Sequence, residues 1–165
     1  MVAMASVLEK IVSGGQTGVD RAALDAALRA EFPCGGWAPK GRFAEDGVIP
    51  ERYPLDECGQ GGSDERTRLN VRDSDATLIL VRGCPPDDLG DGTQLTLHCA
   101  DTLSKPTLVV DLDQPWDAEG VADWLAGSGV RVLNVAGSRE STSPGIYALA
   151  MEFLIPLLDI IGPRS

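Results

Sequence analysis

Short apolar runs alternate with amphipathic stretches along the whole chain. The runs at residues 7–12, 76–81, 107–112 and 131–135 have the length and composition of strands, and residues 34–38 could form a brief further strand. Segments with helical spacing of small and apolar residues lie between them. Strands that alternate with helices predict a mainly parallel sheet with right-handed crossovers. We therefore expect an α/β fold, a three-layer sandwich whose mainly parallel sheet has about five strands.

Capping residues predict where several helices begin. Ser63, Asp117 and Ser143 are residue types preferred at helix N-caps, and Pro144 would then take the first helical position. The last apolar run, residues 146–161, is shorter than the about 20 residues that span a bilayer. It predicts a buried helix that is bent or ended near Pro156.

Three polar turns containing glycine follow predicted strands, at residues 13–21, 90–93 and 134–142. A strand, a glycine turn and a helix start leave backbone N–H groups pointing at an empty space. The helix start adds roughly half a positive charge there. Ligands of parallel α/β sheets bind outside the carboxyl ends of the strands, where the strand order reverses. We expect the three turns to form one site for a small anion. The alternative is that the first turn needs its glycines only for geometry.

A long irregular segment, residues 39–62, is rich in glycine, proline and charge. Loops of this length inside a compact domain are usually functional or mobile, so this one is either a ligand lid or a solvated flap. Four basic side chains on this loop or beside the turns could supply charge to an anion, although a surface cation without a ligand is the commoner case for any one of them: Arg21, Lys40, Arg42 and Arg139.

Composition narrows the partners. A chain of 165 residues with 43% hydrophobic and 24% charged residues predicts one globular domain, residues 1–165. The net charge of −11 disfavours nucleic acid, which needs a basic stripe. Four widely spaced cysteines and one histidine lack zinc-ligand spacing, so buried thiols are the better interpretation. Neither a signal peptide nor a membrane span is indicated, and we expect a cytoplasmic protein.

Four motifs occur in the order SGGQTGVDRAALDAAL, SDATLILV, GDGTQLTL and NVAGSRESTSPGI. Together they resemble the molybdenum carrier family over residues 10–158. That family is similar to a wider Rossmann-like group, which includes the lonely-guy enzymes that hydrolyse nucleoside monophosphates. The resemblance implies a Rossmann-like fold, homo-oligomers and transfer of cargo to molybdoenzymes. It also implies binding of the molybdenum cofactor (molybdopterin), a pterin that bears a phosphate and an oxyanionic metal dithiolene.

The resemblance also implies a set of binding residues, to which the basic side chains above are added. They are Gly14, Gly15, Gln16, Thr17 and Gly18 at the first turn, Gly92 and Thr93 at the second, and Asn134, Gly137, Ser138, Arg139 and Ser141 at the third. The chemistry agrees, because hydroxyls and helix N–H groups can donate to phosphate or molybdate oxygens.

One departure from the wider group bears on catalysis. The lonely-guy enzymes carry P-G-G-x-G-T-x-x-E, whose glutamate takes part in cleaving the N-glycosidic bond. Here the first turn offers Asp20 at a different offset, and the second turn has no glutamate. We therefore expect a non-catalytic carrier with no metal ligands from the protein. The alternatives are a nucleotide-processing enzyme of N-glycosidase type and a nucleotide-sensing module.

Overall fold

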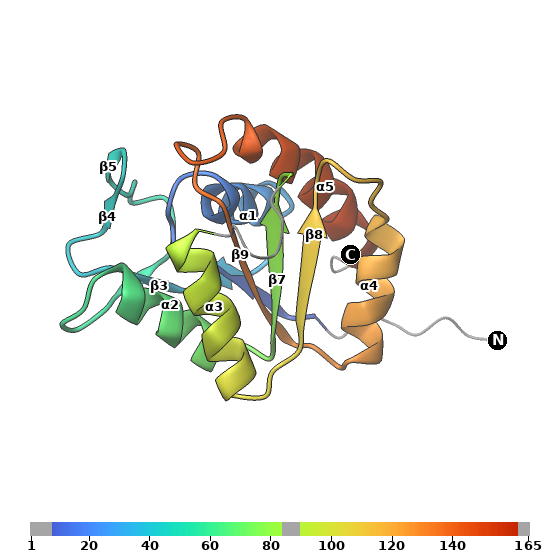
Figure 1. The fold of residues 1–165 in the computed structure, drawn as a ribbon, viewed down its shortest axis with the longest axis horizontal. Helices are drawn as coiled ribbons and strands as arrows, with labels where there is room; N and C mark the ends of the chain where they lie inside the picture. Colours follow the sequence, from blue (N-terminus) through green and yellow to red (C-terminus); the bar gives the residue numbers. More distant parts are fainter. Residues whose placement is uncertain (1–7, 84–89, 162–165) are drawn as a thin grey trace.

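A five-stranded parallel sheet forms the centre of the protein (Figure 1). The structure is a computed structural model, and it describes residues 8–83 and 90–161. The strand order is β2 (Cys34–Gly35), β1 (Lys10–Val12), β9 (Val132–Gly137), β7 (Ala76–Val81) and β8 (Thr107–Asp111), and each neighbouring pair is parallel. The predicted α/β class and sheet are confirmed.

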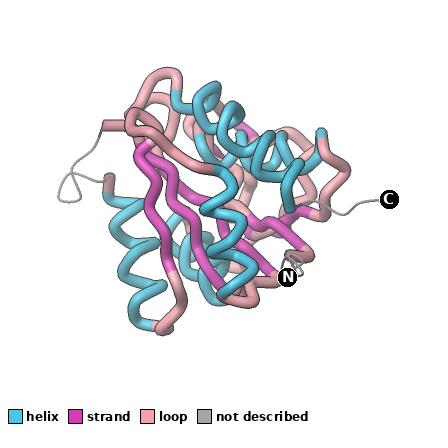
Figure 2. Tube along the Cα trace, turned by 90° about the vertical axis from the view of Figure 1, so that its right-hand side faces the viewer, coloured by secondary structure: helices cyan, strands magenta, loops and turns pink. Residues whose placement is uncertain are grey.

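Helices cover both faces of this sheet, which gives three layers (Figure 2). The pair α2 (Ser63–Arg72) and α3 (Asp91–Thr102) packs together on one face. On the other face lie α1 (Val19–Arg29), α4 (Ala118–Gly127) and α5 (Ile146–Ile161), with α5 packed against both of the others. The predicted three-layer architecture is therefore also confirmed.

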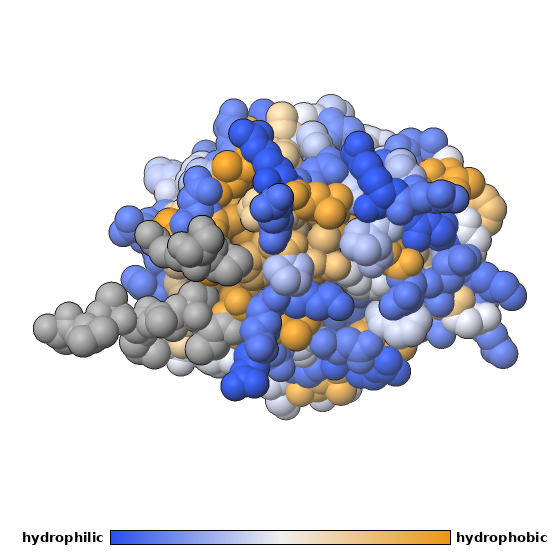
Figure 3. Space-filling model, turned by 180° about the vertical axis from the view of Figure 1, so that it is seen from behind, coloured by the Kyte–Doolittle hydropathy of each residue, from blue (hydrophilic) through white to orange (hydrophobic). Residues whose placement is uncertain are grey.

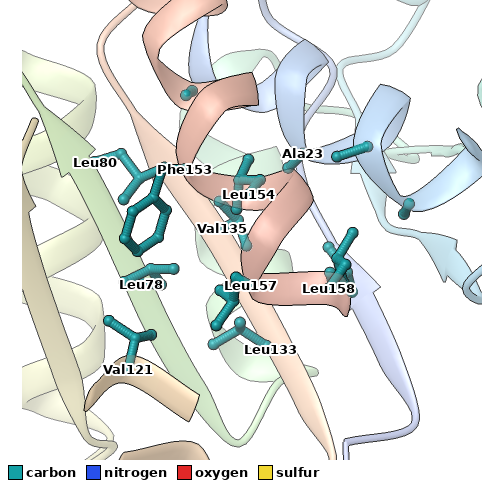
Figure 4. Close-up of a cluster of buried hydrophobic side chains, with 14 of the residues drawn as sticks. Ala23, Leu78, Leu80, Val121, Leu133, Val135, Phe153, Leu154, Leu157 and Leu158 are labelled. Carbon is teal, nitrogen blue, oxygen red and sulfur yellow. The ribbon is translucent and has the colours of Figure 1, made fainter. Parts of the chain in front are cut away.

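The main hydrophobic core lies between the sheet and α5 (Figure 4). Leu78 and Leu80 of β7 point towards this side, where Phe153 of α5 is fully buried. Ile79 and Val81 of the same strand belong to a separate apolar cluster with Leu97 of α3. Because β7 is buried on both faces, its sequence is a continuous apolar run rather than an alternating one.

The expected brief strand at residues 34–38 is two strands in different sheets. Only β2 joins the central sheet, whereas β3 (Trp37–Ala38) pairs with β6 (Asp56–Glu57). Gly36 separates them with a φ of 128°, a backbone conformation that favours glycine. The loop that follows also contains a hairpin of β4 (Phe43–Ala44) and β5 (Gly47–Val48).

Helix ends follow the predicted caps in one case and differ in others. Asp117 caps α4, and its carboxylate accepts a hydrogen bond from the Glu119 amide at 3.1 Å. Ser63 is the first residue of α2 instead of its cap, which is Gly62.

The last helix also departs from its predicted limits. It begins at Ile146 and not at Pro144, because Gly145 has a φ of 90°, which is not helical. The Glu140 carboxylate caps this start, since it accepts hydrogen bonds from the amide of Gly145, just before the helix, and from the amide of Tyr147, in its first turn. It continues through Pro156 to Ile161. Pro156 is an exposed residue inside the helix, and the packing of the buried residues on either side of it, Phe153 and Leu157, holds the helix together past the missing N–H donor.

Within the described residues, no helix is long and apolar enough to cross a membrane. The thiol of Cys58 is buried and those of Cys34 and Cys99 are half-buried, and all three are free. Cys84 lies outside the described residues.

Candidate functional site

A cavity of about 350 Å³ lies at the carboxyl ends of β1 and β9. This is the size of many small-molecule sites. Its walls come from the turn after β1, the inner side of α2, the start of α3, and β9 with the turn that follows. In the sheet, β9 lies between β1 and β7, where the strand order reverses. The cavity is therefore at the place where open α/β sheets bind ligands.

All three glycine turns predicted from the sequence contribute to this one cavity. The predicted residues that line it are Gly14, Gln16, Gly92, Thr93, Asn134, Gly137, Ser138 and Arg139. The remaining predicted residues are not part of its lining: Gly15, Thr17, Gly18, Arg21, Lys40, Arg42 and Ser141.

The first turn is closed by hydrogen bonds within the protein. The Gln16 amide donates to Asp20 at 3.2 Å, and the Val19 amide donates to the Ser138 carbonyl at 3.1 Å. A Cβ at Gly18 would collide with that same carbonyl, so glycine lets the first and third turns pack together. Packing thus accounts for the glycine at position 18, and the amides of Gln16, Thr17 and Val19 donate to acceptors within the protein.

Two of the predicted cations are engaged in structural contacts. Arg42 donates to the carbonyls of four loop residues, Ile49, Pro50, Tyr53 and Leu55. Arg21 forms a two-pronged ion pair with Asp46 at 2.9 Å and donates to the Gly15 carbonyl. Lys40 lies exposed on the loop. Arg139 is exposed at the third turn and is the predicted cation that reaches the cavity.

A buried arginine that the sequence interpretation missed lies in the cavity wall. Arg66 of α2 is 7% exposed, and its Nη1 donates to the Gly14 carbonyl at 3.4 Å. Thr67 and Asn70 of the same helix also line the cavity. The signal available in the sequence is that positions 66, 67 and 70 share one helix face. It was not decisive, because α2 is polar on most of its surface.

Asp20 is a buried carboxyl group that lines the same cavity as this arginine. Burial raises the pKa of Asp20, and the positive charge of Arg66 together with the Gln16 amide opposes part of that rise. The two opposite charges compensate one another inside the protein. Arg139 also lines the cavity, and the Glu45 carboxylate, which lies outside the lining, is close enough to interact with its positive charge.

The start of α3 offers the most open donors. Gly92 and Thr93 line the cavity, and a Cβ at Gly92 would meet nothing within 4 Å. The first amides of a helix have no acceptor inside the helix, and the peptide dipoles favour an anion beside them. Thr93, Ser138 and Thr142, each of which carries a hydroxyl, line the same cavity. The set of donors therefore suits a polar, anionic molecule.

Comparison with known proteins identifies the family. The sequence model of the circularly permutated YpsA SLOG family matches residues 11–158. The chain belongs to this family. The resemblance drawn from the four motifs is thereby confirmed at the level of a SLOG family that contains molybdenum-carrier-like proteins.

A solved structure of similar fold supports the same relationship. This SLOG protein is 43% identical to a "putative molybdenum carrier protein" from Syntrophus aciditrophicus SB, with a TM-score of 0.87. The match covers 93% of this chain and 96% of the other. Among curated proteins, none matches the chain.

The described residues of this SLOG protein contain no group of three or more histidine, cysteine, aspartate or glutamate side chains that could hold a metal ion.

Proposed function

We propose that this SLOG protein binds and carries the molybdenum cofactor, with the anionic groups of the cofactor in the cavity between the three turns. One observation carries the proposal: three turns, of which the first and third lie more than a hundred residues apart in the chain, line a single polar cavity that contains a buried arginine. The name of the similar Syntrophus protein supports the choice of a molybdenum-related cargo.

The residues present fit such a ligand. Arg139 and the start of α3 would hold oxyanions, since a guanidinium and unpaired helix amides both donate to them. Asp20 and Asn134 present acceptor oxygens in the same cavity, which suit the ring N–H groups of a pterin. When bound, the cofactor supplies a phosphate and a metal that its own dithiolene ligates.

Carriage asks only that the protein bind, orient and shield its cargo. The cavity walls are formed by sheet and helices and not by surface loops alone, which limits the access of water and oxidants to a bound pterin. No proton transfer to the cargo is required. This is consistent with the position of the buried carboxyl of Asp20, which already accepts a hydrogen bond from the Gln16 amide and lies within the field of Arg66.

Binding of the cofactor under anoxic conditions tests the proposal. The purified chain is mixed with the cofactor, separated by gel filtration, and assayed for molybdenum and pterin, which we expect at about one per chain. Arg139→Met removes a charge-assisted contact worth about 1.5–3 kcal/mol, so affinity should fall roughly ten- to a hundred-fold. Arg131→Met is the matched control, since Arg131 is exposed beside the other end of β9. Equal affinity of all three proteins would contradict the proposed site.

A second candidate function is hydrolysis of a nucleotide N-glycosidic bond. The observation that favours it is Asp20, a buried carboxyl in the cavity whose pKa is raised, as general acids and bases in enzymes often are. Incubation with AMP distinguishes the two functions. Release of free adenine that is lost in Asp20→Asn supports the enzyme, and cofactor binding without release supports the carrier.

We further propose that the carrier forms a homo-oligomer in the cytoplasm and passes its cargo to molybdoenzymes. The face opposite that of Figure 1 has apolar surface near its middle, framed by hydrophilic residues (Figure 3). The exposed apolar side chains include Leu28 of α1 and Ile160 of α5, at 39% and 38% exposure. Light scattering coupled to gel filtration measures the oligomer, and a strictly monomeric mass would contradict this part of the proposal.

A further inference from the structure

The carboxylate of Glu45, at the tip of the β4–β5 hairpin, lies against donors of the first and third turns. One carboxylate oxygen accepts hydrogen bonds from the Thr17 hydroxyl and from the Ser141 amide, the latter at 3.1 Å. The other accepts a hydrogen bond from the Ser141 hydroxyl. Three donors that converge on one carboxylate are the arrangement expected of an oxyanion site.

These donors continue the wall of the cavity. Thr17 follows Gln16, and Ser141 stands between Arg139 and Thr142, all three of which line the cavity. Partial burial raises the pKa of Glu45, but the hydrogen bonds from Ser141 and Thr17 and the charge of Arg139 outweigh it, so the pKa lies below its usual value. The surroundings of the carboxylate therefore favour a negative charge.

The hairpin itself is built as a small, separately anchored unit. Its base is fixed by Arg42, whose guanidinium donates to carbonyls of the segment that follows. The backbone turns sharply just before β4 and again at the start of β5, where Gly41, Arg42 and Gly47 have positive φ angles of 85°, 56° and 116°. Beyond that base, the tip is attached to the body at three points: the Glu45 carboxylate, the Glu45 amide, which donates to the Gln16 side chain at 2.9 Å, and the Asp46 carboxylate, which pairs with Arg21.

Few apolar contacts hold the hairpin tip. The side chains of Phe43 and Val48 are paired across the two strands, and they are 63% and 64% exposed. Elements with few buried contacts and exposed hydrogen bonds open at a low cost in free energy. The side-chain latches at the tip therefore decide whether the hairpin lies on the turns.

We infer that the Thr17 hydroxyl and the amide and hydroxyl of Ser141 form a second oxyanion subsite at the edge of the cavity. In the free protein the Glu45 carboxylate fills it, and an anionic group of the ligand displaces that carboxylate and releases the hairpin. The inference rests on the proposed function, since it assigns to the ligand of that cavity a second anionic group. It also gives Thr17 and Ser141, which do not line the cavity itself, a role in binding.

Inorganic phosphate is the probe, and its binding is measured by calorimetry on the full chain. If the Glu45 carboxylate occupies the subsite about nine-tenths of the time, the apparent affinity for phosphate is about ten-fold lower than that of the open subsite. Glu45→Ala should therefore bind phosphate about ten times more tightly. Glu45→Gln keeps the size of the side chain and should show a smaller gain. Glu51→Ala removes the same charge from an exposed position on the same loop and should leave affinity unchanged.

Two further measurements locate the effect. Adding Ser141→Ala to Glu45→Ala should abolish the gain, because the subsite then lacks a donor. Hydrogen exchange of the segment 43–49 should speed up in the wild-type protein when phosphate is added, and in Glu45→Ala without it.

Equal phosphate affinity in Glu45→Ala and Glu51→Ala, or no effect of phosphate on exchange of the hairpin, would overturn the inference. Neither result depends on the cofactor. Failure of the subsite is thus separate from failure of cofactor binding by the wild-type protein, which is what would overturn the proposed function.

Discussion

Gly14 leaves no room for a side chain beside Arg66. A Cβ at position 14 would lie 2.5 Å from Arg66 Cδ and 3.0 Å from the Asp20 carboxylate. Because Gly14 has no side chain, the buried Arg66 can lie across the turn and donate to the Gly14 carbonyl. The position of the cavity wall therefore depends on the absence of one methyl group.

Gly14→Ala should displace Arg66 and narrow the cavity. Overpacking of a buried site costs about 1–3 kcal/mol, so we expect unfolding in urea to move to lower concentration while the fold is kept. Ligand affinity should fall more than stability does, because the guanidinium moves within the cavity wall. Gly59→Ala is the control, since a Cβ there would meet nothing within 4 Å. A Gly14→Ala protein with unchanged cofactor affinity would contradict this account of the wall.

Asp20→Asn should change how stability depends on pH. Burial raises the pKa of Asp20 above its ordinary value of 3.8, so between about pH 4 and the raised pKa the folded protein binds more protons than the unfolded chain. Its contribution to stability is therefore full in acid and is lost as the pH rises through the folded pKa. The free energy of unfolding of the wild-type protein, minus that of Asp20→Asn, should decline with rising pH in that window.

Urea unfolding of both proteins across a pH series measures this difference. A loss of stability in Asp20→Asn that does not depend on pH shifts its whole curve without changing the slope. Parallel curves for the two proteins would show that the carboxyl does not titrate abnormally.

The sequence predicts the fold well where burial is uniform. The strand at residues 76–81 is apolar except for Thr77 and is bounded by Asp75 and Arg82, so its limits are visible without a structure. The segment at 34–38 is different, because its two short strands join different sheets on either side of Gly36. That choice depends on a partner, β6, about twenty residues away, and local pattern does not contain it.

The sequence predicted which segments form the candidate site, but not which charged side chains lie in it. Glycine turns after strands indicated the three segments that meet at the cavity. Arg66 was missed because α2 has few apolar residues to reveal its buried face. Arg42 was expected near an anion, but its acceptors are backbone carbonyls of the following segment, whose folding back onto Arg42 has no signature in sequence. Whether each predicted residue contacts ligand stays a prediction.

Tyr147→Phe should destabilise the junction of α5 with α1. The Tyr147 hydroxyl donates to Asp25 at 2.5 Å, and Tyr53 donates to the other oxygen of the same carboxylate at 2.7 Å. A hydrogen bond to a charged group contributes about 1.5–3 kcal/mol. In the variant, Tyr53 and Arg52 still donate hydrogen bonds to Asp25. We expect a loss near the lower figure, measured by urea unfolding at pH 8.

The same tyrosine predicts an alkaline effect. Burial, followed by the hydrogen bond to Asp25, raises the pKa of Tyr147 from 10.0 to about 12. Its stabilising contribution is thus complete below pH 10 and is lost as the pH approaches 12. The stability advantage of wild type over Tyr147→Phe should shrink across that interval, and an advantage that stays constant would contradict the assignment.

Pro156→Ala should stabilise the protein. Proline inside α5 has no N–H to donate to the carbonyl one turn before it, at Glu152, and the helix nonetheless continues to Ile161. Alanine restores that donor at an exposed position where no core packing is lost. A proline inside a helix costs about 3 kcal/mol, part of which the native helix has already relieved by adjusting its backbone. Replacing proline by alanine also gives the unfolded chain more conformational freedom, which lowers the gain in stability by about 0.4–1 kcal/mol. We expect a net gain of about 1 kcal/mol, read from the urea midpoint at constant slope.

Pro144→Ala is the control. Pro144 precedes the helix, where proline costs nothing, so this substitution should leave stability equal or lower. A lower stability of Pro156→Ala would mean that the proline ring contributes packing on the outer side of α5, for instance against a second copy of the chain, and the concentration dependence of the midpoint would then show it.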